Sequence, residues 1–270
     1  MLAVLVLLVA SVVVQAQFRQ RGGGFFPRGF GVRVAKPEDF LGGFQFCRVA
    51  YNQDYRGDGG NWSVDYPRAD INLSIRLSEL TRSYVSMDSA GEPIPLLIRL
   101  TDDVMFECPF IMMTEVGSAS ISDEEAARLR LYLEKGGFLW ADDFWGTYAW
   151  QWWEAQIRKI FPAAEYPFVE LPPDHPLFHS QFQVRKTPQI SSINFWASNG
   201  GSTSERGFDS AEVHTRAILD SKGNIMLLST HNTDLGDSFE REGDDPEYFR
   251  TMSVPGYSFG INVLVYAMTH

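Results

Sequence analysis

Three structural signals meet in Gly136-Gly137-Phe138-Leu139-Trp140-Ala141-Asp142-Asp143-Phe144-Trp145-Gly146. The two glycines are typical of a helix C-terminus, the apolar residues after them predict a short buried strand, and two carboxylates follow where that strand ends. In an open α/β sheet, ligands bind in the crevice at the carboxyl ends of the strands. The Asp142-Asp143 pair is therefore the first candidate for a functional site.

The same alternation of helices and strands extends in both directions from this stretch. A capping box at Ser122-Asp123-Glu124-Glu125 predicts the start of the helix that ends at Gly136. Short apolar runs predict strands over Phe44–Tyr51, Leu96–Thr101, Phe110–Thr114, Phe138–Ala141 and Phe168–Leu171, and a hairpin over Val213–Leu219 and Ile225–Thr230. Amphipathic patterns predict further helices around Leu73–Tyr84, Ala149–Ile160 and Gly256–Met268. This order predicts an α/β fold with a mostly parallel central sheet and helices on both faces.

The beginning of the chain differs in composition from the rest. Residues 1–16 carry no charged side chain and end in Val14-Gln15-Ala16, which predicts a cleaved secretory signal peptide. Residues 17–36 are rich in Gly and Arg and predict a flexible tether, which leaves 37–270 as a single α/β domain. The apolar part of the leader is short for a membrane span. We therefore expect a periplasmic or secreted protein, without a transmembrane helix in the mature chain, rather than a membrane-anchored one.

The net charge indicates which partners the protein does not bind, and the setting of the cysteines indicates their oxidation state. The net charge is −11, and because residues 17–36 hold five basic and no acidic side chains, the remainder stands at −16. An acidic body argues against nucleic-acid binding, which depends on basic patches. Cys47 and Cys108 lie in or beside apolar runs, so we favour two buried free thiols over a disulfide. A disulfide is the alternative in an oxidising compartment.

Polar residues recur directly after the predicted strands. They include Asp102-Asp103, Glu115, Asp142-Asp143, Asp174-His175 and His231. If the strands are parallel, these side chains converge on one edge of the sheet. The densest cluster, His231–Asp237, contains Asp234 and offers an imidazole and carboxylates for acid–base chemistry or for a hard cation. Asx turns within that loop are the structural alternative.

The Asp pair and its aromatic neighbours also have structural interpretations. One of Asp142 and Asp143 is expected to cap the helix that follows, although a single cap does not need two carboxylates. The tryptophans beside the pair could stack on a sugar ring, but aromatic residues at such spacing more often belong to the core. They are Trp145, Trp150 and Trp152.

Recognisable cofactor and metal motifs are absent from the sequence. The chain has no P-loop, no G-x-G-x-x-G and no G-x-S-x-G nucleophile elbow. His175 and His179 have a spacing seen in zinc sites, but Pro176 disfavours a helix there and no third ligand lies nearby. We therefore assign no metal ligand and no cofactor from the sequence.

Five longer motifs stand out: Phe46–Tyr51, Trp62–Asp70, Gly136–Gly146, Asp174–Phe178 and His231–Asp237. Together they resemble the signatures of the bacterial domain-of-unknown-function family 4159, over nearly everything from Phe44 to His270. The resemblance implies a flavodoxin-like, three-layer α/β sandwich, similar to class I glutamine amidotransferases and trehalose-utilisation-type domains. In the amidotransferases a nucleophilic Cys occupies a tight turn after a strand, whereas here the comparable turn carries the Asp pair. Without a thiolate no glutamyl thioester forms, so glutaminase activity is not expected.

Two hypotheses of function follow. The first is an exported ligand- or partner-binding module of the cell envelope, which takes a polar small molecule or an envelope protein. Its binding residues would be Asp142, Asp143, Trp145, His175, His231 and Asp234. The second is a hydrolase, metal-dependent in one version, acting on a carbohydrate or similar polar substrate. There one carboxylate of the Asp pair would serve as base or metal ligand, with His231 as its partner.

Overall fold

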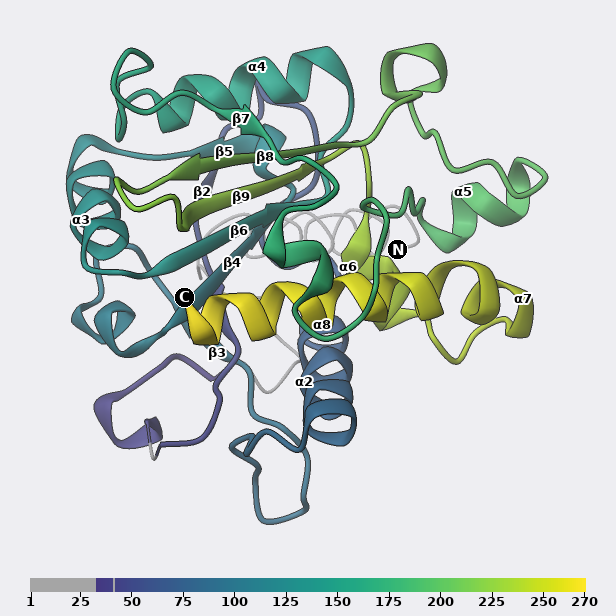
Figure 1. The fold of residues 1–270 in the computed structure, drawn as a ribbon, viewed down its shortest axis with the longest axis horizontal. Coiled ribbons are helices and arrows are strands. Elements are labelled where there is room, and N and C mark those ends of the chain that lie inside the picture. The colour runs from purple at the N-terminus through teal and green to yellow at the C-terminus, as the bar shows by residue number, and fades with distance from the viewer. Residues whose placement is uncertain (1–32, 41) are drawn as a thin grey trace, which may run out of the picture. The chain divides into compact units, whose positions relative to one another are not determined.

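A computed structural model of the chain describes residues 33–40 and 42–270 (Figure 1). The predicted signal peptide and residues 17–32 of the predicted tether lie outside these described residues. The remaining tether residues pair with an edge strand of the sheet. The N–H of Ala35 donates to the carbonyl of Leu97 at 2.8 Å, and the N–H of Leu97 donates to the carbonyl of Arg33 at 2.8 Å.

The centre of the fold is a seven-stranded sheet. Its strands are β1 (Cys47–Val49), β3 (Leu96–Ile98), β4 (Phe110–Thr114), β6 (Phe138–Asp142), β7 (Val169–Glu170), β8 (His214–Leu219) and β9 (Ile225–His231). In the spatial order β3-β1-β4-β6-β9-β8-β7, the first five strands are parallel, β8 is antiparallel to β9, and β7 is antiparallel to β8 and so runs in the direction of the first five. A separate antiparallel pair joins β2 (Asn52–Gln53) to β5 (Ala119–Ser120). The predicted mostly parallel sheet and the predicted hairpin are both confirmed.

Helices cover both faces of this sheet (Figure 1). The helices on the two faces include α2 (Arg68–Thr81), α3 (Asp123–Glu134), α4 (Gly146–Ile157) and α8 (Val254–Thr269). The shorter helices are α5 (Ile193–Ser198), α6 (Leu235–Glu240) and α7 (Pro246–Tyr248). On one face, Trp140 of β6 packs against Phe259 of α8, with ring centroids 6.4 Å apart. On the other face, the indole N–H of Trp153 in α4 donates to Ser229 Oγ at 3.0 Å. None of the described helices is long and apolar enough to span a membrane.

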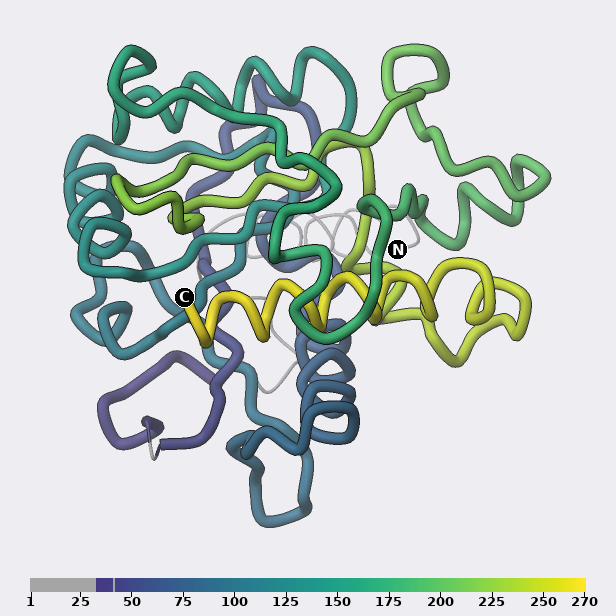
Figure 2. The backbone as a smooth tube through the Cα atoms, in the orientation of Figure 1, coloured from purple at the N-terminus to yellow at the C-terminus, as the bar shows by residue number. Residues whose placement is uncertain are grey.

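Two helices from opposite ends of the domain lie side by side on the α8 face. Figure 2 traces α2, near the beginning of the described chain, to a position next to α8 at its end, and α6 contacts both. Their apolar residues share one core with alternate residues of the central strands, including Phe110, Met112 and Leu228. This packing brings the first turns of α2 and α6 to the same region of the fold.

The helix before β6 begins and ends where the sequence predicts. Ser122 Oγ accepts the N–H of Glu125 at 3.2 Å, and the Glu125 carboxylate accepts the N–H of Ser122 at 2.8 Å. Gly136 follows the helix with φ +94°, a conformation that favours glycine. This capped helix fixes the direction in which the chain enters β6.

Cys47 and Cys108 form a disulfide, so the prediction of two free thiols is wrong. The prediction that both cysteines are buried is confirmed, since both are almost fully buried. The pairing depends on β1 and β4 being parallel neighbours, which places Cys47 next to the segment that enters β4. The two residues are 61 positions apart, and nothing in either local pattern indicates that contact.

Loss of the disulfide should destabilise the fold. The Cys47→Ala/Cys108→Ala variant is expected to unfold with a free energy about 2 to 4 kcal/mol below that of the oxidised chain, because the crosslink restricts the unfolded chain. Urea unfolding followed by tryptophan fluorescence measures the difference. A reductant should destabilise the native chain and leave the variant unchanged. Two free thiols per oxidised chain in denaturant would contradict the disulfide.

Candidate carboxylate site

Asp142 ends β6 and is bonded within the protein. Its carboxylate accepts the hydroxyl of Thr230 and the N–H groups of Leu235 at 2.9 Å and Gly236 at 3.3 Å. Burial raises the pKa of Asp142 to about 7, while these bonds act in the opposite direction. The predicted capping role is therefore found at Asp142, but the helix it caps is α6 and not α4, the next helix along the chain.

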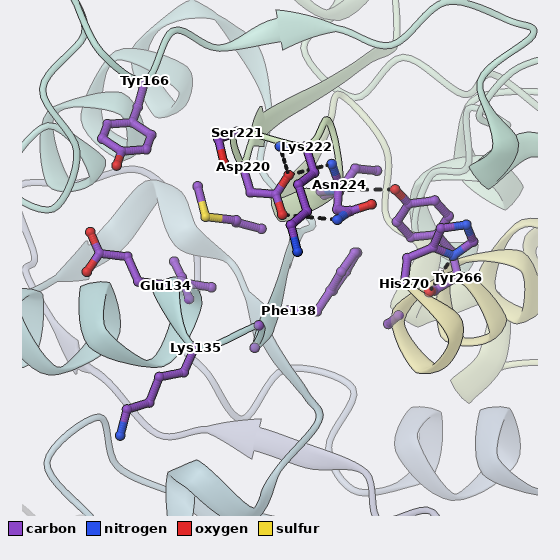
Figure 3. A pocket seen from close by; sticks show the side chains of 16 residues that line it. Glu134, Lys135, Phe138, Tyr166, Asp220, Ser221, Lys222, Asn224, Tyr266 and His270 are labelled. Carbon is purple, nitrogen blue, oxygen red and sulfur yellow. Dashed lines mark hydrogen bonds between the residues drawn. The ribbon is translucent and has the colours of Figure 1, made fainter.

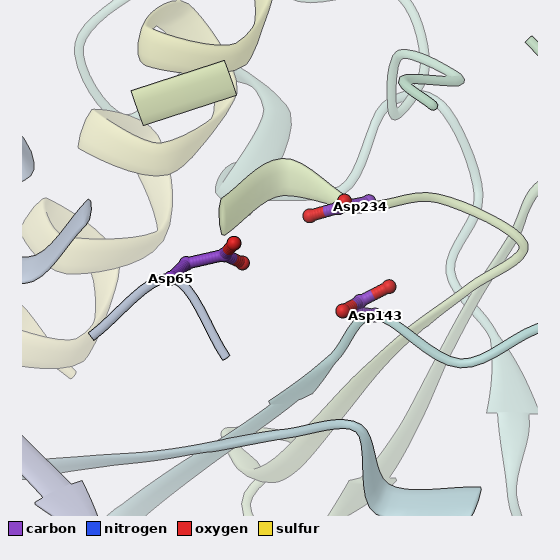
Figure 4. A group of neighbouring side chains, drawn as sticks. All are labelled: Asp65, Asp143 and Asp234. Atoms are coloured by element: carbon purple, nitrogen blue, oxygen red, sulfur yellow. The ribbon is translucent and has the colours of Figure 1, made fainter. Parts of the chain in front are cut away.

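Asp143 points to a different set of partners. It lies in the turn between β6 and α4 with φ +55°, and its Oδ1 accepts the indole N–H of Trp145 at 3.1 Å. Figure 4 shows its carboxylate facing those of Asp65 and Asp234. One carboxylate oxygen from each of these three residues lies within 4.8 Å of the other two. We call Asp65, Asp143 and Asp234 the carboxylate triad.

The other two members of the triad lie at the starts of helices. Asp65, with φ +61°, precedes α2, and its carbonyl accepts the N–H of Ala69 at 2.9 Å. Asp234 is the N-cap of α6, and its Oδ1 accepts the N–H of Asp237 at 2.8 Å. Packing of α2 and α6 on the sheet thus assembles the triad from three distant segments.

The triad concentrates negative charge in the interior. Its members are only 4% to 9% exposed. Burial raises the pKa of each well above its ordinary value, and the charges of neighbouring carboxylates raise it further. Asp65 Oδ2 is buried with no hydrogen-bond partner, and within the described chain no basic side chain forms an ion pair with any of the three. Such perturbed carboxyl groups are typical of functional sites.

Asp65 also belongs to a second acidic group, whose other two members have partners within the protein. Asp65, Asp237 and Glu240 also bring carboxylate oxygens within 4.8 Å of one another. Here Arg241 Nε lies 2.6 Å from Glu240 and 3.6 Å from Asp237. Asp237 Oδ2 further accepts the N–H of Ile193 at 2.5 Å and the hydroxyl of Tyr248 at 3.1 Å. The protein itself therefore supplies partners for Asp237 and Glu240.

Glu115 borders the triad. It follows β4 with φ +55°, and burial raises its pKa to about 7. Its charge contributes to the raised pKa of Asp143. Side chains at Gly59 or Gly60 would collide with the Glu115 carboxylate, so the 59–60 backbone can approach it only because both residues are glycine. Glu115 is a carboxyl group that can exchange a proton near neutral pH.

The two predicted site histidines do not join the triad. His231 lies on the α4 face of the sheet, where its ring stacks on Phe144 at 4.9 Å and its Nε2 is 2.9 Å from the carbonyl of Gly146. Burial lowers its pKa to about 3. His175 lies 5.6 Å from the ring of Tyr266, whose hydroxyl accepts the N–H of the first residue of β9. His175 is therefore at the amino edge, opposite the triad.

The remaining sequence candidates have packing roles. Trp145 is buried and bonded to Asp143, while Trp152 donates to the carbonyl of Ala119 at 2.7 Å. Trp150 packs beneath the guanidinium of Arg216, 4.0 Å from its ring centroid. Trp145 therefore fits the core interpretation, whereas Trp150 and Trp152 are only half-buried. Stacking of these indoles on a sugar ring stays a prediction.

A pocket of about 410 Å³ lies at the amino edge of the sheet, where β6 and β9 begin (Figure 3). Its lining includes Glu134, Lys135, Tyr166, Asp220, Lys222 and His270. It contains none of the predicted site residues and no member of the triad. The pocket and the triad are therefore separate features at opposite edges of the sheet.

Sequence reasoning missed Asp65 and did not select Glu115. Asp65 follows no predicted strand. The available signal was its place in the Trp62–Asp70 motif, which precedes the predicted helix of Leu73–Tyr84. Glu115 was noted after its strand, but nothing local distinguished it from a solvent-exposed turn residue.

The fold and the site together define an α/β protein with a buried carboxylate triad at the carboxyl edge of a mostly parallel sheet. Residues 45–268 match the family model described as domain of unknown function DUF4159, and the chain belongs to that family. A comparison with functionally curated proteins gave no significant match.

Proposed function

We propose that this protein is an exported binding module of the cell envelope that holds a positively charged group at the carboxyl edge of its sheet. The observation that carries the proposal is the convergence of Asp65, Asp143 and Asp234 without a basic partner among the described residues. Three buried like charges oppose folding unless something outside the chain compensates them. A ligand with positive charge does so.

Two features support this proposal. The first concerns export, and the second concerns the residue that stands where amidotransferases have their nucleophilic Cys. The Cys47–Cys108 disulfide agrees with the oxidising compartment that the predicted signal peptide implies. Asp143 occupies a left-handed turn between β6 and α4, where the resemblance places the nucleophilic Cys of amidotransferases. A carboxylate there suits binding of a cation rather than formation of a thioester.

Charge removal at Asp143 provides the test. We expect Asp143→Asn to raise the free energy of unfolding of the chelator-treated chain by about 1 to 2 kcal/mol at pH 8, because it removes a buried charge without a basic partner. Binding sites are commonly kept at such a cost in stability. Asn retains an acceptor for Trp145 and tolerates a positive φ. The folded-state pKa of Asp143 lies above its unfolded value, so native stability falls as the pH rises from about 4 towards that folded-state pKa. Near pH 4 the carboxyl group of Asp143 is uncharged in the folded chain, so the gain in stability from Asp143→Asn should be close to zero there.

Asp142→Asn is the matched control, because its carboxylate lies next in sequence but already accepts bonds from the protein. The pKa of Asp142 is also raised, to about 7, so its charge too costs stability at pH 8. Asn does not replace both acceptor oxygens, however, and Asp142→Asn should lose about 1 to 2 kcal/mol near pH 4 and less at pH 8. Urea unfolding at both pH values measures all three chains. If Asp143→Asn leaves stability unchanged or lowers it at pH 8, the charge of Asp143 is compensated inside the fold and the proposal is wrong.

A second candidate function is a hydrolase acting on a carbohydrate or similar polar substrate, and Glu115 is the observation that favours it. A carboxyl group with a pKa of about 7 beside other carboxylates suits general acid–base chemistry near neutral pH. His231 Nε2 lies 2.9 Å from the carbonyl of Gly146, and among the described residues no hydrogen bond or ion pair joins His231 to Glu115. Turnover of p-nitrophenyl glycosides that is lost in Glu115→Gln would favour the hydrolase over the binding module.

A further inference from the structure

We infer that the positively charged group is a hard divalent metal ion, held directly by Asp65, Asp143 and Asp234. This inference rests on the proposed function, since it names the ligand of the same site. Ca²⁺, Mg²⁺ and Mn²⁺ form the class that oxygen ligands of this kind select.

The spacing of the triad fits coordination by one ion. Each member offers a carboxylate oxygen within 4.8 Å of the other two. Two oxygens on opposite sides of a Ca²⁺ ion, at bond lengths of 2.3 to 2.6 Å, are roughly 4.6 to 5.2 Å apart. Three such oxygens can therefore share one ion with little or no movement. Figure 4 shows the three carboxylates facing a common centre.

The unpartnered oxygen of Asp65 is a separate indication of a ligand. Asp65 is 9% exposed, and its Oδ2 has no hydrogen-bond partner, although buried carboxylate oxygens normally have one. This carboxylate faces Asp143 and Asp234 (Figure 4). A side chain at Gly236 would collide with Asp65 Oδ2, so the α6 backbone and Asp65 approach each other closely. A metal ion would supply the interaction that Asp65 lacks.

The surroundings favour a metal ion over an organic cation. All three carboxylates are buried, which leaves little access for the stem of an ammonium or guanidinium group. The neighbouring Asp237 and Glu240 already have Arg241, so they do not compete for the ion. No nitrogen or sulfur ligand belongs to either acidic group of the described chain, which disfavours zinc and copper.

Calorimetric titration of the EDTA-treated protein with CaCl₂, MgCl₂ or MnCl₂, each alone, tests the inference. We expect one ion per chain for at least one of these metals. Asp65→Asn and Asp143→Asn should each weaken binding at least about tenfold, because loss of a direct ligand exceeds a typical outer-shell effect. Both positions have a positive φ that Asn adopts readily, so both variants should fold.

Two further variants show which carboxylates hold the ion. Glu240→Gln removes charge from the second acidic group and should change the affinity by less than about threefold, since Arg241 already pairs with Glu240. Asp103→Asn changes an exposed carboxylate and should leave binding unchanged. Tb³⁺, used in place of Ca²⁺, should show luminescence excited through Trp145, which is bonded to Asp143. That emission should fall in Trp145→Phe and on competition with CaCl₂.

The outcomes separate this inference from the proposed function. If none of the three metals binds while Asp143→Asn still stabilises the ligand-free chain, the metal inference is wrong and the proposed function stands. If a metal binds equally well to wild type, Asp65→Asn and Asp143→Asn, the ion lies elsewhere and the inference is also wrong. If no metal binds and Asp143→Asn brings no stability, both proposals fail.

Discussion

Replacing Asp70 by Ala is expected to lower the free energy of unfolding by about 3 to 5 kcal/mol. Asp70 of α2 forms a bidentate ion pair with Arg48 of β1, and both side chains are fully buried. Removing one partner leaves the other charge buried without compensation, which is far more costly than losing an exposed pair. Urea unfolding of the purified variant measures the loss.

The double variant Arg48→Met/Asp70→Leu is the control for this explanation. It removes both charges and keeps apolar volume, so it should recover most of the stability lost in Asp70→Ala. Breaking the exposed i,i+4 pair of Arg130 and Glu134 with Glu134→Ala should cost less than about 1 kcal/mol. A loss below about 1 kcal/mol for Asp70→Ala would show that Arg48 can reach water or another acid.

Asp142→Ala is the second substitution with a large expected effect, a loss of roughly 3 to 5 kcal/mol. It leaves two buried N–H groups at the start of α6 without an acceptor, whereas the Thr230 hydroxyl can still donate to the carbonyl of Ala141 at 3.2 Å. Because α6 also carries Asp234, misplacement of this helix should abolish binding of any ligand at the triad. Denaturant unfolding gives the first effect and calorimetry the second.

Asp142→Asn provides the comparison, since one acceptor oxygen remains for the α6 N–H groups. It should lose only about 1 to 2 kcal/mol. We therefore expect the two residues of the Asp pair to have opposite effects on stability. Asp142 stabilises the fold, whereas Asp143 destabilises it in the absence of ligand. Equal effects of Asp142→Ala and Asp143→Ala on stability would contradict this division of roles.

The sequence predicts the elements around β6 closely. The capping box at Ser122, the glycine at 136 and the apolar run of Phe138–Ala141 are local signals, and each depends only on neighbouring residues. The hairpin of β8 and β9 is predicted for the same reason, because its strands are joined by a short turn. The Asp pair could therefore be placed at the carboxyl edge of the sheet from its position after a strand.

The positions of His175 and His231 were not predicted correctly from their places after strands. His231 follows a strand, as predicted, but strand side chains alternate between the two faces of a sheet. A polar residue at the correct edge can therefore lie on the wrong face, and His231 does. His175 is at the opposite edge although β7, the strand before it, runs in the same direction as the five parallel strands. It comes after the end of β7, in a segment that returns along the sheet to Tyr266 of α8, so its position after a strand did not place it correctly.

By itself the sequence determined the order of the seven sheet strands and of the long helices α2, α3, α4 and α8, the mostly parallel character of the sheet, the family and the strand end that carries Asp142 and Asp143, but not the short helix α6. These properties follow from hydrophobic periodicity, capping residues and short-range turns. Only the tertiary structure decided which residues meet: Cys47 with Cys108, Arg48 with Asp70, and Asp65 with Asp143 and Asp234. The physical reason is that these contacts depend on how α2 and α6 pack against the sheet and on which strands are neighbours. Packing over such long separations leaves no signal in the residues next to each partner.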